Sequence, residues 1–276
     1  MQTSIAQMVA LTCYGNAAIQ GRQAAFLPSH STCQYCEWVK FIAGGRQANG
    51  TDETITVAAS PAAWIEYLLK SGMQGLRLHQ RAQNLAANFP DRISSAFVGG
   101  GRQWRIEGLR SDETSEFWLS KWEVGNKDAP EHKIWRVTYG LCEVGVTSAF
   151  ELRTISSILD DLRTALTEIR NFSETNRCGN FTKCFDDALH ALDDSEADVG
   201  YHRDLYPMGA VGTGAASLLK AAQSAWVFGG MGSWNDMGFE GETQKEYERI
   251  SDKLFELLND AIEAAATSSR VAAPRE

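Results

Sequence analysis

Residues 227–239, Val-Phe-Gly-Gly-Met-Gly-Ser-Trp-Asn-Asp-Met-Gly-Phe, separate two stretches of helical periodicity. Four glycines stand between large apolar side chains, a composition that a solvated linker does not need. A Gly-Gly pair after a helix supplies a left-handed C-cap and a sharp turn, which lets Trp234 and Phe239 fold back onto the helices. The segment therefore predicts a packed helix-to-helix turn with a candidate binding or structural motif at Gly229, Gly230, Gly232, Ser233, Trp234, Asn235 and Asp236.

Apolar residues recur at nearly every fourth position on both sides of this turn, from about Thr147 onward. Ser148 and Glu151 have the spacing of a capping box for the first helix. Short connections between amphipathic helices are typical of antiparallel neighbours. We therefore predict an antiparallel helical bundle over residues 147–276, with helices that include Ile155–Ile169, Phe181–Leu192, Ala215–Trp226 and Tyr247–Ile262.

The first 146 residues show a period of two instead. Alternating or continuous apolar runs bounded by Gly, Asp and Asn predict strands at Met8–Tyr14, Glu37–Ala43, Thr54–Ala58, Trp104–Leu109, Glu116–Val124 and Ile134–Val146. Ser60-Pro61 predicts a helix start, with Ser71-Gly72 as its end, and Gly75–Ala87 is a second amphipathic candidate. The fold class that follows is α+β: a mostly antiparallel sheet with one or two helices in a domain of residues 1–146, closely packed on the bundle.

Composition narrows the functional classes. The 276 residues are 43% hydrophobic and 22% charged, as expected of a globular protein. A net charge of −9 argues against general nucleic-acid binding, which depends on clustered Lys and Arg. No apolar run is long enough to span a membrane, and residues 1–11 do not resemble a secretory signal, so we expect a cytoplasmic protein with mostly reduced cysteines.

The segment from His30 to Cys36 contains the densest set of metal-ligand residue types. A Cys-x-x-Cys pair, Cys33 and Cys36, with His30 upstream, offers three zinc ligands, and Cys13 is a possible fourth. A second matched cysteine pair is missing. The alternatives are a redox Cys-x-x-Cys, although no helix start follows Cys33, and ordinary partly buried thiols.

Other motifs carry weaker chemical signals. The glycines before Arg102, residues 99–101, lack the lysine and the strand-loop-helix context of a phosphate loop and predict a turn. The run 209–214 precedes a helix whose N-terminus could bind an anion. Asp186 and His190 share a helix face and suit a surface pair better than a metal site, and His202 is a lone loop histidine.

The segment 228–236, followed by an acidic amphipathic helix, resembles the C-terminal motif of small bacterial proteins, some of which are similar to immunity proteins of polymorphic toxin systems. The resemblance covers about forty residues and brings no catalytic motif. It implies a non-enzymatic, cytoplasmic binder that neutralises a toxin by occlusion. The acidic charge would then steer it toward a basic partner.

Two alternatives stand beside this interpretation. The motif at 229–236 can be purely structural, with Trp234 closing one end of the bundle. An enzyme for a small molecule or nucleotide would have its site in a cleft between sheet and bundle and use some of His30, His202, Arg102 and Asp236. A binder would instead expose aromatic residues, for which the candidates are Trp118, Trp122 and Trp135.

Overall fold

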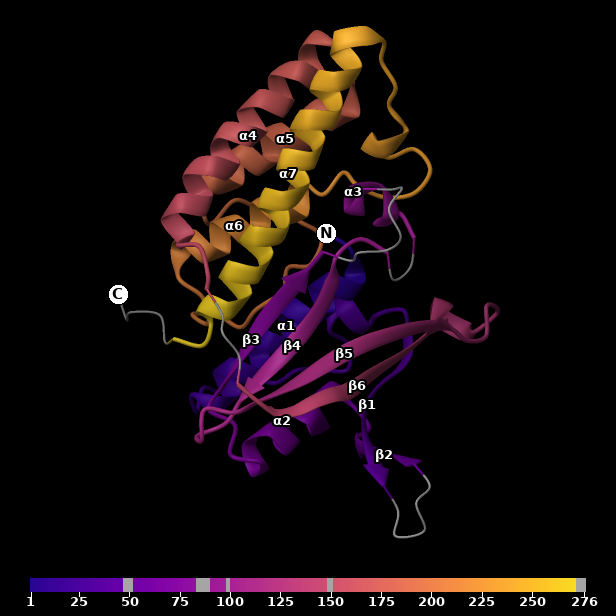
Figure 1. Ribbon diagram of the computed structural model, residues 1–276, viewed down its shortest axis with the longest axis vertical. Coiled ribbons are helices and arrows are strands. Elements are labelled where there is room, and N and C mark those ends of the chain that lie inside the picture. Colours follow the sequence, from indigo (N-terminus) through magenta and orange to yellow (C-terminus); the bar gives the residue numbers. More distant parts are fainter. Residues whose placement is uncertain (47–51, 83–89, 98–99, 148–150, 272–276) are drawn as a thin grey trace.

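The computed structural model describes residues 1–46, 52–82, 90–97, 100–147 and 151–271. They form a six-stranded mixed sheet in the N-terminal half and a group of long helices in the C-terminal half, which stands on one end of the sheet (Figure 1). The predicted α+β class is therefore confirmed.

The sheet has the strand order β2-β1-β6-β5-β4-β3, with β1 parallel to β6 and all other neighbours antiparallel. Aromatic side chains pack one face of the sheet against α2 (Pro61–Lys70). The fully buried Trp118 ring has its centroid 5.9–6.0 Å from the rings of Phe41, Trp64 and Tyr67. The segment between the predicted strands Glu37–Ala43 and Thr54–Ala58 includes residues 47–51, which lie outside the described part. The strands are β1 (Cys36–Arg46), β2 (Asp52–Ala58), β3 (Gly75–Arg81), β4 (Gln103–Leu109), β5 (Ser115–Val124) and β6 (Trp135–Val146).

The predicted strand Met8–Tyr14 is wrong, because this run belongs to helix α1 (Thr3–Ile19). Thirteen of its residues are buried, including Gln7, Thr12 and Asn16, since the helix lies between β3, β4, α2 and α7. A helix buried on every side shows no polar stripe, so its apolar run cannot be distinguished from a buried strand by periodicity.

The predicted helix Gly75–Ala87 is also wrong over its described residues, which form β3. Leu76 and Leu78 are fully buried, as the period of a strand requires, and residues 83–87 lie outside the described part. The outer edge of β3 is covered by side chains: the backbone N–H groups of Leu76 and Leu78 donate to Asn16 Oδ1 (2.7 Å) and Thr267 Oγ1 (3.0 Å). Tertiary contacts thus complete an edge strand that the sequence alone does not mark.

Helix α2 (Pro61–Lys70) follows the prediction at both ends. The Ser60 hydroxyl accepts from Ala63 N at 3.2 Å, and Gly72 has φ +68° directly after the C-cap residue Ser71. Helix α3 (Asp91–Ser94) is a single turn beside α7. α1 and α2 contact each other as well as the sheet.

The C-terminal half consists of α4 (Ile155–Thr175), α5 (Asn180–Asp193), α6 (Thr213–Ser224) and α7 (Gly241–Ser268). α4 contacts α5 and α7, and α6 contacts the same two helices, so the four close into a bundle (Figure 1). The predicted capping box is wrong: α4 starts at Ile155, with Thr154 Oγ1 accepting from Ser157 N at 3.2 Å. Ser148 lies outside the described residues. One continuous hydrophobic core runs through both halves, with α1 and α7 at their junction.

Candidate functional site

The motif after α6 packs Trp234 into the end of the bundle. Its side chain is fully buried, and its ring lies 5.2–5.4 Å from the rings of Phe181, Phe185 and Tyr247. The indole Nε1 donates to Ser251 Oγ at 2.7 Å, and Tyr247 OH donates to the Trp234 carbonyl. These contacts give the tryptophan a structural role and leave no part of its ring for a ligand.

The polar residues of the motif hold the backbone around Trp234 in place through hydrogen bonds. Ser233 caps the short helix η3 (Trp234–Asp236), and Asp236 accepts from Gly232 N. Asn235 exchanges hydrogen bonds with Arg92 of α3, which joins the motif to the sheet half. The left-handed residue is Gly232, with φ +84°, whereas the predicted Gly229-Gly230 C-cap is wrong because neither glycine has a positive φ.

The four residues predicted to hold zinc do not converge. Cys33 and Cys36 lie together beside Gln7, but the His30 ring is bonded to Thr32 and Asp204. Cys13 lies beside Ser269, and burial raises the pKa of its thiol to about 12. Among the described residues, no group of three or more His, Cys, Asp or Glu side chains is placed to hold a metal ion.

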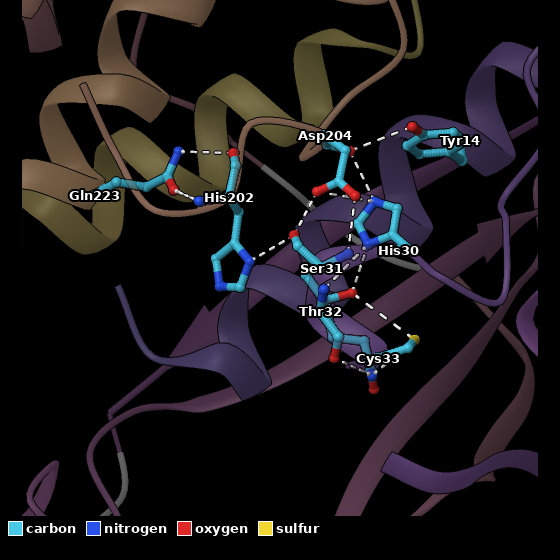
Figure 2. A network of polar contacts seen from close by, with 9 residues as sticks. Tyr14, His30, Ser31, Thr32, Cys33, His202, Asp204 and Gln223 are labelled. Carbon is cyan, nitrogen blue, oxygen red and sulfur yellow. Dashed lines mark hydrogen bonds and ion pairs between the residues drawn. The ribbon is translucent and has the colours of Figure 1, made fainter. Parts of the chain in front are cut away.

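His30 instead belongs to a polar network that connects η1 (Ser31–Cys33) to the loop before α6 (Figure 2). Its Nε2–H donates to the Asp204 carbonyl at 2.7 Å, and Nδ1 accepts from Thr32. The ring is stacked on Phe26 at 4.3 Å. Burial lowers the pKa of His30 although Asp204 opposes this, so the ring is a neutral structural element.

Asp204, Ser31 and His202 form a chain of side-chain hydrogen bonds in the same network (Figure 2). Ser31 donates its hydroxyl proton to Asp204 Oδ1, and its backbone N donates to Oδ2 at 2.8 Å; together these bonds outweigh burial and hold the Asp204 pKa below its usual value. His202 Nδ1 lies 2.7 Å from the Ser31 hydroxyl and must donate to it. Burial lowers the His202 pKa to about 4. This order differs from a catalytic triad, in which the carboxylate orients the histidine rather than the serine.

The remaining predicted residues are scattered. Arg102 lies near the sheet–bundle junction, where its Nη1 donates to Gln80 Oε1 at 2.7 Å, and Gly99 lies outside the described residues. Asp186 accepts from Arg170 Nε at 2.9 Å, which makes it part of a surface ion pair. The four residues proposed for an enzyme site therefore occupy three places: the polar network, the junction and the motif after α6.

The structure does contain a cleft between the sheet and the bundle, with a volume of about 770 Å³. Its walls are the start of α1, the ends of β4, β5 and β6, the residues after α3, and the loop after α6. Arg102, Lys121 and Tyr35 also border it. The apolar lining residues include Ile5, Met8, Phe97, Trp104, Trp122, Trp135, Trp226 and Phe228.

Three tryptophans of this cleft have an unusual polar feature. The indole N–H groups of Trp104, Trp122 and Trp226 are buried and have no hydrogen-bond acceptor within the described part of the chain. A buried donor without an acceptor costs about 1–3 kcal/mol. Trp64 Nε1 in the closed core shares this feature, but three of the unpaired donors lie along one cleft, and an acceptor from another molecule reaches them once the cleft side chains move aside.

The sequence identified part of this site. Trp122, Trp135 and Arg102 were candidates, and all three border the cleft, whereas the candidate Trp118 is fully buried with its indole N–H donating to Glu116. Trp104 and Trp226 were missed, since a tryptophan that starts a strand or follows a helix is usually a core residue. Trp104 lies in β4 and Trp226 follows α6, so no sequence signal joins them.

No protein-family model, curated protein or solved structure matches this chain, so fold and site define it by themselves: an α+β protein with an aromatic cleft at the junction of sheet and bundle. None of the helices in the described ranges has the length and apolarity of a membrane span.

Proposed function

We propose that this chain is a protein-binding module that takes an apolar segment of its partner into the aromatic cleft. The observation that carries the proposal is the set of unpaired indole donors on Trp104, Trp122 and Trp226. An extended peptide offers both hydrogen-bond acceptors and apolar groups: once the side chains over the indole nitrogens move aside, its carbonyl groups accept from the indoles while its side chains cover the rings. Tryptophan is also the residue type most enriched at binding hot spots.

Charge favours a basic partner. Residues 151–271 contain 21 Asp and Glu against 11 Lys and Arg, so this half carries the acidity of the whole chain. The charged side chains that line the cleft itself are Arg102 and Lys121, and Glu256, 68% exposed, is paired with Arg102 at 3.7 Å. The negative charge that would attract a basic partner therefore lies on the helical half rather than in the cleft. Together with the resemblance to immunity proteins, this supports a role in which the chain occludes a basic toxin.

Indole N–H resonances provide the direct test. Peptides selected by display on the full chain would serve as probes, and each would be titrated into protein labelled with ¹⁵N. Binding in the cleft should shift the indole resonances of Trp104, Trp122 and Trp226 and leave those of Trp118 and Trp234, which already have partners at Glu116 and Ser251.

Two variants sharpen the result. Trp122→Phe should weaken the peptide about tenfold, while Trp38→Phe, outside the cleft and under Lys40, should leave the affinity unchanged. Failure to select any peptide that moves the three cleft resonances would overturn the proposal. A small molecule that moves them where peptides do not would instead establish the small-molecule alternative.

A further inference from the structure

Cys33 and Cys36 lie next to the cleft, on the turn that leads from η1 into β1. Cys33 is the last residue of η1, Cys36 is the first of β1, and a two-residue turn joins them. A four-residue turn holds its first and last Cα atoms within about 7 Å. A disulfide spans about 4.4–6.8 Å between Cα atoms, so this turn has the dimensions that the bond requires.

The side-chain amide of Gln7 lies beside both cysteine sulfur atoms. Gln7 Nε2 lies 3.5 Å from Cys33 Sγ and 3.8 Å from Cys36 Sγ. The amide is fixed in turn, because Nε2 donates to the Thr32 carbonyl at 3.0 Å and Oε1 accepts from Tyr139 OH at 3.0 Å. The amide N–H supplies the donor to sulfur that a helix N-terminus supplies in other Cys-x-x-Cys sites.

The two thiols differ in access, as a nucleophile and a resolving thiol do. Cys33 is partly exposed, whereas Cys36 is 8% exposed and its thiol donates to the Thr32 carbonyl at 3.9 Å. A disulfide in solution can therefore reach Cys33, and Cys36 lies behind it. This is the arrangement in which a mixed disulfide is resolved within the chain.

We propose that Cys33 and Cys36 form a reversible dithiol–disulfide site that reacts with low-molecular-weight disulfides. The Cys33 thiolate attacks one sulfur of the small disulfide, forms a mixed disulfide and releases one thiolate. Cys36 then loses its proton to solvent, attacks Cys33 Sγ and releases the second thiolate. The protein loses two electrons and two protons, and the small disulfide is reduced to two thiols.

Oxidation of the two cysteines would change the wall of the cleft, although the inference does not rest on the proposed function. Thr32, Tyr35 and Cys36 all border the cleft, so the disulfide would form in its wall. The new bond would also replace the thiol hydrogen bond from Cys36 to Thr32.

Oxidised glutathione is the probe for this site. The full chain would be incubated with it, alkylated and mapped by mass spectrometry. We expect the loss of two hydrogens from the peptide that contains both cysteines, with alkylation kept at Cys13, Cys142, Cys178 and Cys184. Cys36→Ser should trap a glutathione adduct on Cys33, and Cys33→Ser should slow oxidation at Cys36 at least about tenfold.

Cys142→Ser is the matched control, since this exposed thiol should leave the internal disulfide unaffected. Cys36→Ala beside Cys36→Ser, each checked by thermal unfolding, separates a reactivity effect from a folding defect. The proposal is overturned if wild-type Cys33 and Cys36 can still be alkylated after incubation with a large molar excess of oxidised glutathione and no added thiol. Persistent adducts on Cys33 in the wild type, without resolution by Cys36, would overturn it equally.

Discussion

The bundle end around Trp234 and the cleft at the sheet–bundle junction are both rich in aromatic residues, but the indole N–H groups differ in their hydrogen bonding. Trp234 donates to Ser251 and is surrounded by aromatic rings. Trp104, Trp122 and Trp226 have no such acceptor within the described ranges. The first region uses tryptophan to stabilise the fold, and the second leaves donors whose cost a bound partner would offset.

The largest expected effect is on the bundle end. Trp234→Ala should lower the free energy of unfolding by about 3–5 kcal/mol, because a fully buried ring would leave a cavity among three aromatic neighbours. Urea denaturation followed by far-UV circular dichroism measures this loss. A change below about 1 kcal/mol would mean that the ring contributes little to the bundle.

The contact between α7 and β3, where Glu263 accepts from Gln80, should make stability depend on pH. Burial raises the pKa of Glu263 on α7 to about 7, while the ordinary value is 4.5. The folded chain therefore keeps a proton that the unfolded chain releases, so this stability is complete below about pH 4.5 and is lost as the pH rises through 7. Urea unfolding should show that the wild type loses free energy of unfolding between about pH 5 and pH 8, by on the order of 2 kcal/mol more than Glu263→Gln does.

Conservative replacement separates the two kinds of tryptophan. Trp234→Phe should cost about 1–3 kcal/mol, because it leaves Ser251 without its donor and the ring site underfilled. Trp122→Phe should change the free energy of unfolding by less than about 0.5 kcal/mol, because the loss of ring contacts is offset by the removal of a buried donor that has no acceptor. Parallel urea titrations test the pair, and equal losses would remove the distinction between the two regions.

The smallest expected effect lies within the motif itself. Gly232→Ala should cost about 1 kcal/mol because the residue has φ +84°. Gly230→Ala should be neutral or stabilise by a few tenths of a kcal/mol, because no atom lies within 4 Å of its added Cβ and its φ is not positive. Thermal unfolding of both variants and the wild type shows whether the turn requires glycine at one of the two positions or at both.

The candidate site was only partly predictable. Trp122 and Trp135 stand out as large aromatic residues in two predicted strands, but the sequence does not show that they share a cleft with Trp226, which lies far away in the chain. The cysteines illustrate the opposite case. Spacing brought Cys33 and Cys36 together correctly, whereas His30 turns to Asp204 because its ring finds better hydrogen-bond partners in the folded chain.

Local patterns by themselves determined the α+β class, β1, β4, β5 and β6, the start of α2 at Ser60-Pro61 and the four bundle helices. Most of these elements have a buried and an exposed face, which produces a periodic pattern of apolar residues in the sequence, and the start of α2 is marked by a cap that acts within a few residues. Only the tertiary structure decided α1, β3 and the cleft. α1 is buried on all sides, the edge of β3 is completed by Asn16 and Thr267, and the cleft is lined from elements distant in sequence, so their order depends on contacts that no local pattern encodes.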